Sequence, residues 1–396
     1  MTFSFMAAMP RHVWVLSFAQ ALSMTTINVN IINTGLIGSA IAPALWMATL
    51  PLSFQFLSAM MTTLPASLLM GRFGRRPIFA AGIVIALIAT TLQGAAVLNG
   101  SFTVFFIGSF LLGMAQGIAQ FYRYAAADNL HSKLKPQAVS MVLLGGLAAA
   151  VMGPEISIRT GLLIDTAPYA GCYFAIAALQ IVAMVTIGLL DVPLPERQHF
   201  QGRRIRQIFT LPKFILGLVA SSLGYAVMVF VMTATPLQVV NISLLGDTQN
   251  ARIIQWHVIA MFAPSFFTGG LIKKWGYKAI MISGLVCYLA SIGFGLIGTE
   301  FIHYFISLIC LGLGWNFLFV SGSALIADVA SPVERGRVQG VADFLLTFFI
   351  AFASFSAGAL HSVIGWNNLL LGTLLPVTII GVVVMVLAPS LQTSSK

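Results

Sequence analysis

The sequence predicts an all-α integral membrane protein with twelve transmembrane helices, arranged as two pseudo-symmetric six-helix bundles. The first observation behind this prediction is composition: 59% of the residues are hydrophobic and 8% are charged, whereas a soluble protein carries about 25% charged residues. The second is a series of apolar segments long enough to cross a bilayer. The third is a short sequence that occurs once in each half of the chain.

Each apolar segment is close to the length of about 20 residues that the hydrocarbon core of a bilayer requires. Helices are the expected form, because an open backbone in lipid would leave its polar groups without hydrogen bonds. In the first half we expect helices at residues 13–38, 44–70, 78–98, 102–127, 137–162 and 171–191. In the second half we expect them at residues 213–236, 252–272, 279–298, 301–326, 338–361 and 367–388.

The repeated sequence is a glycine turn followed by cations. Residues 67–77 read SLLMGRFGRRP, and residues 269–278 read GGLIKKWGYK. Each copy ends an apolar segment, turns at a glycine (Gly74 or Gly276) and leaves Lys and Arg side chains before the next segment. Two such turns at equivalent places, about two hundred residues apart, indicate an internal repeat of two parallel halves.

The distribution of cations predicts the orientation of the helices. Eighteen of the 20 Lys and Arg residues fall on one side of the membrane, and Arg159 and Arg252 fall on the other. The eighteen are Arg11, Arg72, Arg75, Arg76, Arg123, Lys133, Lys135, Arg197, Arg203, Arg204, Arg206, Lys213, Lys273, Lys274, Lys278, Arg335, Arg337 and Lys396. Because cations accumulate on the cytoplasmic side of the inner membrane, we expect both termini in the cytoplasm. The same clustering argues against nucleic acid as a partner of this +10 chain and for contact with membrane lipid.

A long polar stretch divides the chain into two domains. We expect an N-terminal six-helix bundle at residues 1–191, a cytoplasmic linker at 192–212 and a C-terminal six-helix bundle at 213–396. The linker has two interpretations. Either its apolar residues, among them Ile205 and Ile208, form a short helix on the membrane surface, or the segment is a solvated connection.

These features resemble the major facilitator superfamily of secondary transporters over essentially the whole chain. The turn after the second helix resembles that family's signature of glycines and cations around one acidic residue. The matching residues are Arg72, Gly74, Arg75 and Arg76 in the first copy, and Gly269, Lys274, Gly276 and Lys278 in the second. Gly71 and Lys273 stand where the family has its acid. The resemblance implies transport by alternating access of two six-helix halves.

Two further patterns match the family in part. The fourth helix contains GMAQG, in which Gln116 and Gly117 match, while Gly113 stands where proton-coupled members carry an arginine. The fifth helix contains AAAVMGP, whose Gly153 and Pro154 resemble the signature of antiporters. The second pattern favours efflux over uptake.

Polar side chains within the apolar helices are the candidates for contact with a solute. In the family, the first, fourth, seventh and tenth helices line the central cavity. The solute-binding candidates on these helices are Asn28, Asn30, Gln116, Gln120, Arg123, Tyr225, Trp315 and Asn316. Amides and aromatic rings suit hydrogen bonding and stacking of a small organic molecule. The alternative is that the amides only join neighbouring helices.

Charged and titratable groups inside the helices carry a second set of hypotheses, because a charge in the bilayer is costly without a partner or a function. Arg123 either binds an anionic group or extends to the membrane surface. Glu155, expected near mid-bilayer, is a candidate proton carrier, but it also stands four residues before Arg159 and is able to pair with it. His257 is the second proton-coupling candidate, with a hydrogen-bonded structural histidine as the alternative.

The family resemblance also implies a gate. In the family, the signature acid takes part in a cytoplasmic contact between the halves, where the turn after the second helix meets the start of the eleventh. Here Asp343 in the eleventh helix supplies a carboxylate. We therefore expect Asp343 to pair with Arg72 or Arg75 when the cytoplasmic side is closed.

The sequence thus predicts a secondary transporter that moves a small organic solute, with protons as the coupling ion and efflux favoured. Uptake of a nutrient, vitamin or metal chelate is the first alternative, and a carrier-like receptor or assembly factor is the second. An enzyme is disfavoured, because the sequence contains no metal-ligand cluster, nucleotide-binding loop or catalytic nucleophile set. For the same reason we expect no metal site and no cofactor. The three cysteines lie in apolar segments and are interpreted as packing residues, and we expect a monomer.

Overall fold

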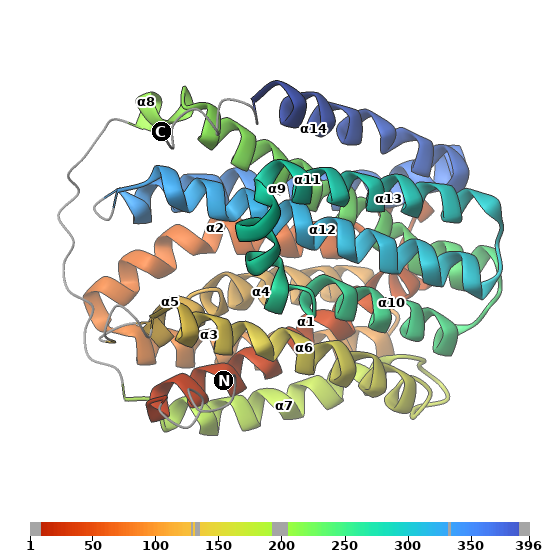
Figure 1. Cartoon of the computed structure of the whole chain (residues 1–396). Coiled ribbons are helices and arrows are strands. Elements are labelled where there is room, and N and C mark those ends of the chain that lie inside the picture. Colours follow the sequence, from red (N-terminus) through yellow and green to blue (C-terminus); the bar gives the residue numbers. More distant parts are fainter. Residues whose placement is uncertain (1–8, 128–129, 131–134, 192–204, 332–333, 388–396) are drawn as a thin grey trace, which may run out of the picture. The chain divides into compact units, whose positions relative to one another are not determined.

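The computed structural model describes residues 9–127, 130, 135–191, 205–331 and 334–387. All regular structure within these ranges is helical (Figure 1). Nine of the helical segments described there are long and apolar enough to cross a membrane. The structure therefore agrees with the all-α membrane fold class that the sequence predicts.

The described chain divides into two compact units, of which the first lies within Met1–Ala44 and Leu50–Arg197. Its helices are α1 (Arg11–Ile41), α2 (Leu50–Phe73), α3 (Arg75–Leu98), α4 (Phe102–Ala119), α5 (Tyr122–Ala127), α6 (Lys135–Thr160) and α7 (Ala170–Gly188). α1 packs along α6, α4 packs against both α2 and α3, and α7 packs against α3. Buried apolar side chains of α1, α3, α5 and α6 form the largest part of this unit's core.

The second unit lies within Leu45–Thr49 and Gln198–Lys396. Its helices are η2 (Leu45–Met47), α8 (Ile205–Phe209), α9 (Pro212–Pro236), the π-helical η3 (Leu237–Ile242), α10 (Asp247–Phe262), α11 (Ser265–Ile297), α12 (Phe301–Val329), α13 (Arg335–Gly372) and α14 (Leu374–Leu387). α12 packs against α9, α10 and α11, while α13 and α14 pack against α9.

The observed helix boundaries differ from the predicted segments at several places. The predicted helix 252–272 is broken between Phe262 and Ser265, and the predicted helix 367–388 is broken between Gly372 and Leu374. α4 ends at Ala119 and α5 begins at Tyr122, so the predicted helix 102–127 is broken in two. α11 and α13 are each longer than one predicted segment, but each contains a glycine with non-helical backbone, Gly276 or Gly365. Every predicted segment contains helix where it is described. That twelve segments cross the membrane stays a prediction.

The predicted linker lies outside the described residues from 192 to 204. The description resumes with α8, so a short helix is present, as one of the two interpretations requires. Its Ile208 is fully buried in a cluster with Phe214 of α9 and Ile326 of α12. The apolar face of this helix is therefore covered by its own unit.

The two repeat turns have the same backbone conformation. Gly74 has φ 90° and ψ 167°, and Gly276 has φ 79° and ψ 164°. This region of backbone space is essentially restricted to glycine, and it costs other residues about 1–3 kcal/mol. Each glycine therefore ends one helix and begins the next within one residue. After the first turn, Arg76 Nη2 donates to the carbonyl oxygen of Gly188, at the last residue of α7, over 2.7 Å.

Candidate functional site

Asn30 of α1 is the centre of a buried amide network in the first unit. Its side chain is fully buried, and its Oδ1 accepts hydrogen bonds from the Tyr173 hydroxyl and from Gln93 Nε2, both at 3.0 Å. Its Nδ2 donates to Oε1 of Gln55. Gln93 Nε2 also donates to Oγ of Ser109 at 3.0 Å. Since buried polar groups without partners are costly, these bonds hold α1, α2, α3, α4 and α7 in one arrangement.

The network reaches Gln116 of α4 through Gln55. Gln55 Nε2 donates to Gln116 Oε1 at 2.9 Å. The helices approach closely here, because a Cβ added at Gly113 would overlap the carbonyl oxygen of Gln55 and the hydroxyl of Ser58. Gly113 therefore permits the contact of α2 with α4. Gln116 is half-buried, and its amide nitrogen makes no hydrogen bond to the part of the chain that the structure describes.

A small hollow lies beside Gln116 within the first unit. Its walls come from α1, α3, α4 and α7, and they include Ser23, Thr26, Ala86 and Gln180. Gln180 Nε2 donates to Oγ1 of Thr26 at 2.7 Å across this region.

Asn28 joins α1 to α6. Its Nδ2 donates to the carbonyl oxygen of Ala149 at 3.0 Å. Gly153 lies one turn further along α6, and a Cβ there would come within 2.7 Å of the Asn28 Cβ. Asn33 adds a third contact between these helices, because its Nδ2 donates to Ser157 Oγ at 2.8 Å. The glycine of the AAAVMGP sequence thus has a packing role that does not depend on the direction of transport.

The second unit contains an aromatic cluster at Trp315 of α12. The Trp315 ring stacks on Phe319 with centroids 4.8 Å apart and an interplanar angle of 9°. Tyr225 of α9 and Phe262 of α10 meet Trp315 edge-on, at 5.2 Å and 5.8 Å. Trp315 is 4% exposed, and its indole N–H is buried without a hydrogen-bond partner among the described residues. Tyr225, Phe262 and Phe319 are half-buried, so part of each ring stays accessible.

Asn316, the next residue, joins α12 to the α10–α11 corner. It is fully buried, and its Nδ2 donates to the carbonyl oxygen of Met261 and to Ser265 Oγ, both at 2.6 Å. Its Oδ1 accepts from Thr268 Oγ1 at 2.7 Å. These contacts suit the alternative in which an amide joins helices, and solute contact by Asn316 stays a prediction.

Arg123 lies in α5, beyond the break in the fourth predicted helix. Its Nη2 donates to the Tyr124 hydroxyl at 3.0 Å, and its guanidinium carbon lies 4.8 Å from the centre of that ring. Gln120 is half-buried and follows the last residue of α4, and its backbone N–H donates to the carbonyl oxygen of Gln116 at 3.1 Å. Solute contact by Arg123 and Gln120 stays a prediction.

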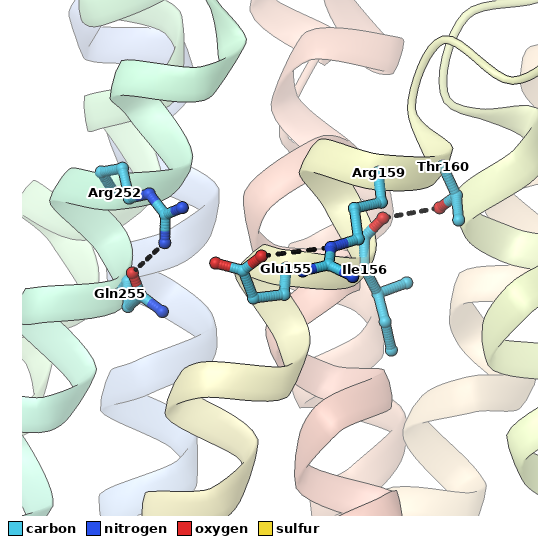
Figure 2. Close-up of polar contacts among 6 residues, drawn as sticks. All are labelled: Glu155, Ile156, Arg159, Thr160, Arg252 and Gln255. Atoms are coloured by element: carbon cyan, nitrogen blue, oxygen red, sulfur yellow. Dashed lines mark hydrogen bonds and ion pairs between the residues drawn. The ribbon is translucent and has the colours of Figure 1, made fainter.

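Glu155 forms an ion pair with Arg159 one turn later on α6 (Figure 2). Glu155 Oε2 lies 3.4 Å from Arg159 Nε, and the two side chains are 28% and 78% exposed. α6 ends at Thr160, five residues beyond Glu155, and the depth of Glu155 in the bilayer stays a prediction. In the second unit, Arg252 Nη1 donates to Gln255 Oε1 at 2.8 Å (Figure 2).

His257 of α10 is fully buried, and its Nδ1 donates to the carbonyl oxygen of Leu308 at 2.7 Å. This bond suits the structural alternative for His257, and its part in proton coupling stays a prediction. Among the proposed gate residues, Arg72 lies in the last turn of α2 with its guanidinium carbon 5.2 Å from the Phe73 ring centre, and Arg75 begins α3. Asp343 lies in α13 of the other unit, so the predicted pairing is untested.

Sequence reasoning missed five residues that complete these clusters. They are Gln55, Gln93, Tyr173, Phe262 and Phe319. The sequence does indicate Gln55 and Gln93, because an amide within an apolar helix needs a hydrogen-bond partner. They lie on the second and third helices, whereas the solute-binding candidates come only from the first, fourth, seventh and tenth helices.

The chain matches the Major Facilitator Superfamily over residues 13–251 and 248–396. It is 38% identical over 363 residues to the riboflavin transporter RfnT of Brucella anthropi, and the match covers 91% of each chain. It is 32% identical to the uncharacterized MFS-type transporter YdeG of Bacillus subtilis, with coverage of 85% of this chain and 83% of that protein.

Two solved structures share the fold. The nucleoside transporter NupG superposes with a TM-score of 0.68 at 14% identity, covering 95% of this chain and 99% of that one. A bacterial homologue of the iron transporter ferroportin, in its outward-facing state, gives 0.67 at 16% identity, with coverage of 96% and 100%. With the matches in sequence over both halves, these likenesses establish that the chain belongs to the Major Facilitator Superfamily and is a multi-pass membrane transporter.

Proposed function

We propose that this transporter takes up riboflavin or a closely related flat heteroaromatic solute. The relative of known substrate is named for riboflavin transport, and it matches this chain over most of both lengths. Vitamin uptake is also an alternative that the sequence leaves open. Efflux, which the antiporter-like sequence of α6 favours, stays the alternative, and Gly153 of that sequence also packs against Asn28.

The observation that carries this proposal is the aromatic cluster at Trp315. Flat fused rings stack on aromatic side chains, and each such contact contributes about 0.5–1.5 kcal/mol beyond area burial. A buried N–H without a partner costs about 1–3 kcal/mol, which a ligand with an acceptor oxygen or nitrogen relieves. Riboflavin has both features, because its three-ring system carries carbonyl oxygens and unprotonated ring nitrogens. The half-buried rings of Tyr225, Phe262 and Phe319 offer the stacking surface.

The remaining parts of the proposal concern energy and orientation. Transport proceeds by alternating access in the cytoplasmic membrane, with both termini in the cytoplasm, as the cation distribution supports. Protons are the coupling ion, with Glu155 as their carrier, and the functional molecule is a monomer.

Quenching of flavin fluorescence by the purified full-length protein tests the binding step. Trp315→Phe keeps a ring but removes the N–H, and we expect about a tenfold weaker riboflavin affinity. Trp256→Phe is the matched control, because Trp256 lies in the same unit and pairs with Phe305 at 6.0 Å but is 47% exposed. Wild-type protein that does not bind riboflavin, or equal losses in both variants, would refute the proposal.

Transport is tested separately in proteoliposomes. A carrier shows saturable counterflow of labelled riboflavin, whereas the receptor alternative gives binding without flux. In intact cells, uptake predicts accumulation of external riboflavin that depends on this chain. Net export of preloaded riboflavin under the same conditions would favour the efflux alternative.

A further inference from the structure

The amide network of the first unit has a defined direction. Asn30 Oδ1 receives two donors, Tyr173 O–H and Gln93 Nε2, so the opposite end of that amide, Nδ2, must donate. Nδ2 donates to Gln55 Oε1, which leaves Gln55 Nε2 to donate onward to Gln116 Oε1. Each amide thus fixes the orientation of the next.

The opposite direction of donation along the network is less favourable, because of the surroundings of Gln93. In the observed direction, the side-chain carbonyl oxygen of Gln93 is buried without a partner among the described residues. If every amide exchanged the positions of its oxygen and its NH₂ group, the Gln93 oxygen would accept the hydrogen bonds from Asn30 and Ser109. The Gln93 NH₂ group would then be buried in the place of the oxygen, with two unpaired donors instead of one unpaired acceptor. Burying more unpaired polar groups costs more free energy, so the network favours the direction that the structure shows.

We propose that Tyr173, Asn30 and Gln55 are positioning residues that orient the Gln116 amide so that its N–H groups, not its carbonyl oxygen, face the transported solute. The Gln116 oxygen is occupied by Gln55, and its nitrogen makes no bond to the described residues. The group recognised is a hydrogen-bond acceptor, such as a carbonyl oxygen or ring nitrogen of a heterocycle. This inference rests on the proposed function. It adds that the first unit donates the hydrogen bond to the solute and the solute accepts it.

We call the hydrogen-bonded series Tyr173, Asn30, Gln55 and Gln116 the relay. Gln55→Glu tests it, because protonation of the new carboxyl group sets the direction of the hydrogen bond to Gln116. In its protonated form this carboxyl group still donates to Gln116 Oε1, as the native amide does. In its ionised form it only accepts, so Gln116 must turn its N–H group inward and present its oxygen to the solute. The affinity for riboflavin, measured by fluorescence quenching, should equal that of the wild type at low pH and fall about tenfold as pH rises.

Two further variants provide a control and a second test for this measurement. Gln20→Glu is the control: Gln20 is also buried on α1, about 15 Å along the helix from Asn30, and it makes none of the relay's bonds. Its riboflavin affinity should not follow pH. Gln116→Glu changes the half-buried end of the relay and should lose about tenfold in affinity once ionised, even if Gln55→Glu does not fold. Affinity of either relay variant that matches the wild type at every pH would overturn the proposal.

A ligand-free measurement separates this inference from the proposed function. Tyr173→Phe and Gln55→Leu each break the relay, so the double variant should lower Tm no further than the more damaging single variant. Additive losses would show that no relay exists. If the wild type does not bind riboflavin but the losses are non-additive, the proposed function fails while the relay stands.

Discussion

The two units share a repeated sequence and the same turn conformation, but their polar interiors differ. The first unit is built around amides, with Asn30 bonded to three other helices. The second has an aromatic cluster whose members meet through ring contacts. Gln116 of α4 is half-buried, whereas Asn316 of α12 is fully buried with three hydrogen bonds. The repeat therefore preserves the backbone, while the side chains have taken separate roles.

This difference predicts different sensitivity to substitution. An amide network requires every member, because removal of one leaves its partners buried and unpaired. Aromatic contacts are less directional, and another apolar side chain of similar volume retains much of the buried area. We therefore expect substitutions in the amide network of the first unit to destabilise the protein more than substitutions in the aromatic cluster of the second unit.

The largest expected effect is that of Asn30→Leu. It breaks three bonds between helices at roughly 1 kcal/mol each, so the free energy of unfolding should fall by about 3 kcal/mol. Phe319→Leu, which shortens a half-buried ring of the aromatic cluster, should cost about 1 kcal/mol. Denaturant unfolding in the same detergent gives both values. Equal losses for the two variants would contradict the proposed contrast between the units.

The second largest effect is expected at the glycine turns that the two units share. Gly74→Ala and Gly276→Ala each force a Cβ onto backbone that only glycine adopts readily, and each should destabilise the protein by about 1–3 kcal/mol. Gly276 has no atom within 4 Å of the new Cβ, so backbone strain alone is measured there. Denaturant unfolding again gives both values.

Gly71→Ala and Gly269→Ala are the matched controls for these turns. Both lie within helices and have open surroundings, so alanine should be neutral or stabilise by up to about 1 kcal/mol. A large loss in only one of the two turn variants would show that the turns differ in importance despite their common conformation.

The turns also show how much of the fold is readable from the sequence. Glycine followed by cations, in two copies, identified both reversals, because few residues other than glycine allow that backbone. The position of each apolar segment followed from length and hydropathy. The break between α4 and α5 did not, since no Gly or Pro marks Gln120 and Phe121.

The site was less predictable, for a physical reason. Asn30, Gln116 and Trp315 were selected as polar or aromatic residues in apolar segments, but the sequence contains no measure of which helix each one faces. Partners such as Gln55 and Tyr173 lie 25 and 143 residues from Asn30. Only the packing of α1 against α2, α3 and α7 brings them together.

The smallest expected stability effect is that of Glu155→Gln, and it separates the two hypotheses for this residue. Its partner Arg159 is 78% exposed, so the pair should contribute no more than about 0.5 kcal/mol. Loss of the Arg159 pair by itself therefore predicts only a small change in stability. If Glu155 carries the coupling proton, Glu155→Gln abolishes riboflavin accumulation driven by a pH gradient in proteoliposomes, while exchange of riboflavin down its own gradient persists. Arg159→Gln breaks the same ion pair but keeps the carboxylate, so it should retain gradient-driven accumulation. Normal accumulation in both variants would leave Glu155 a structural residue of α6.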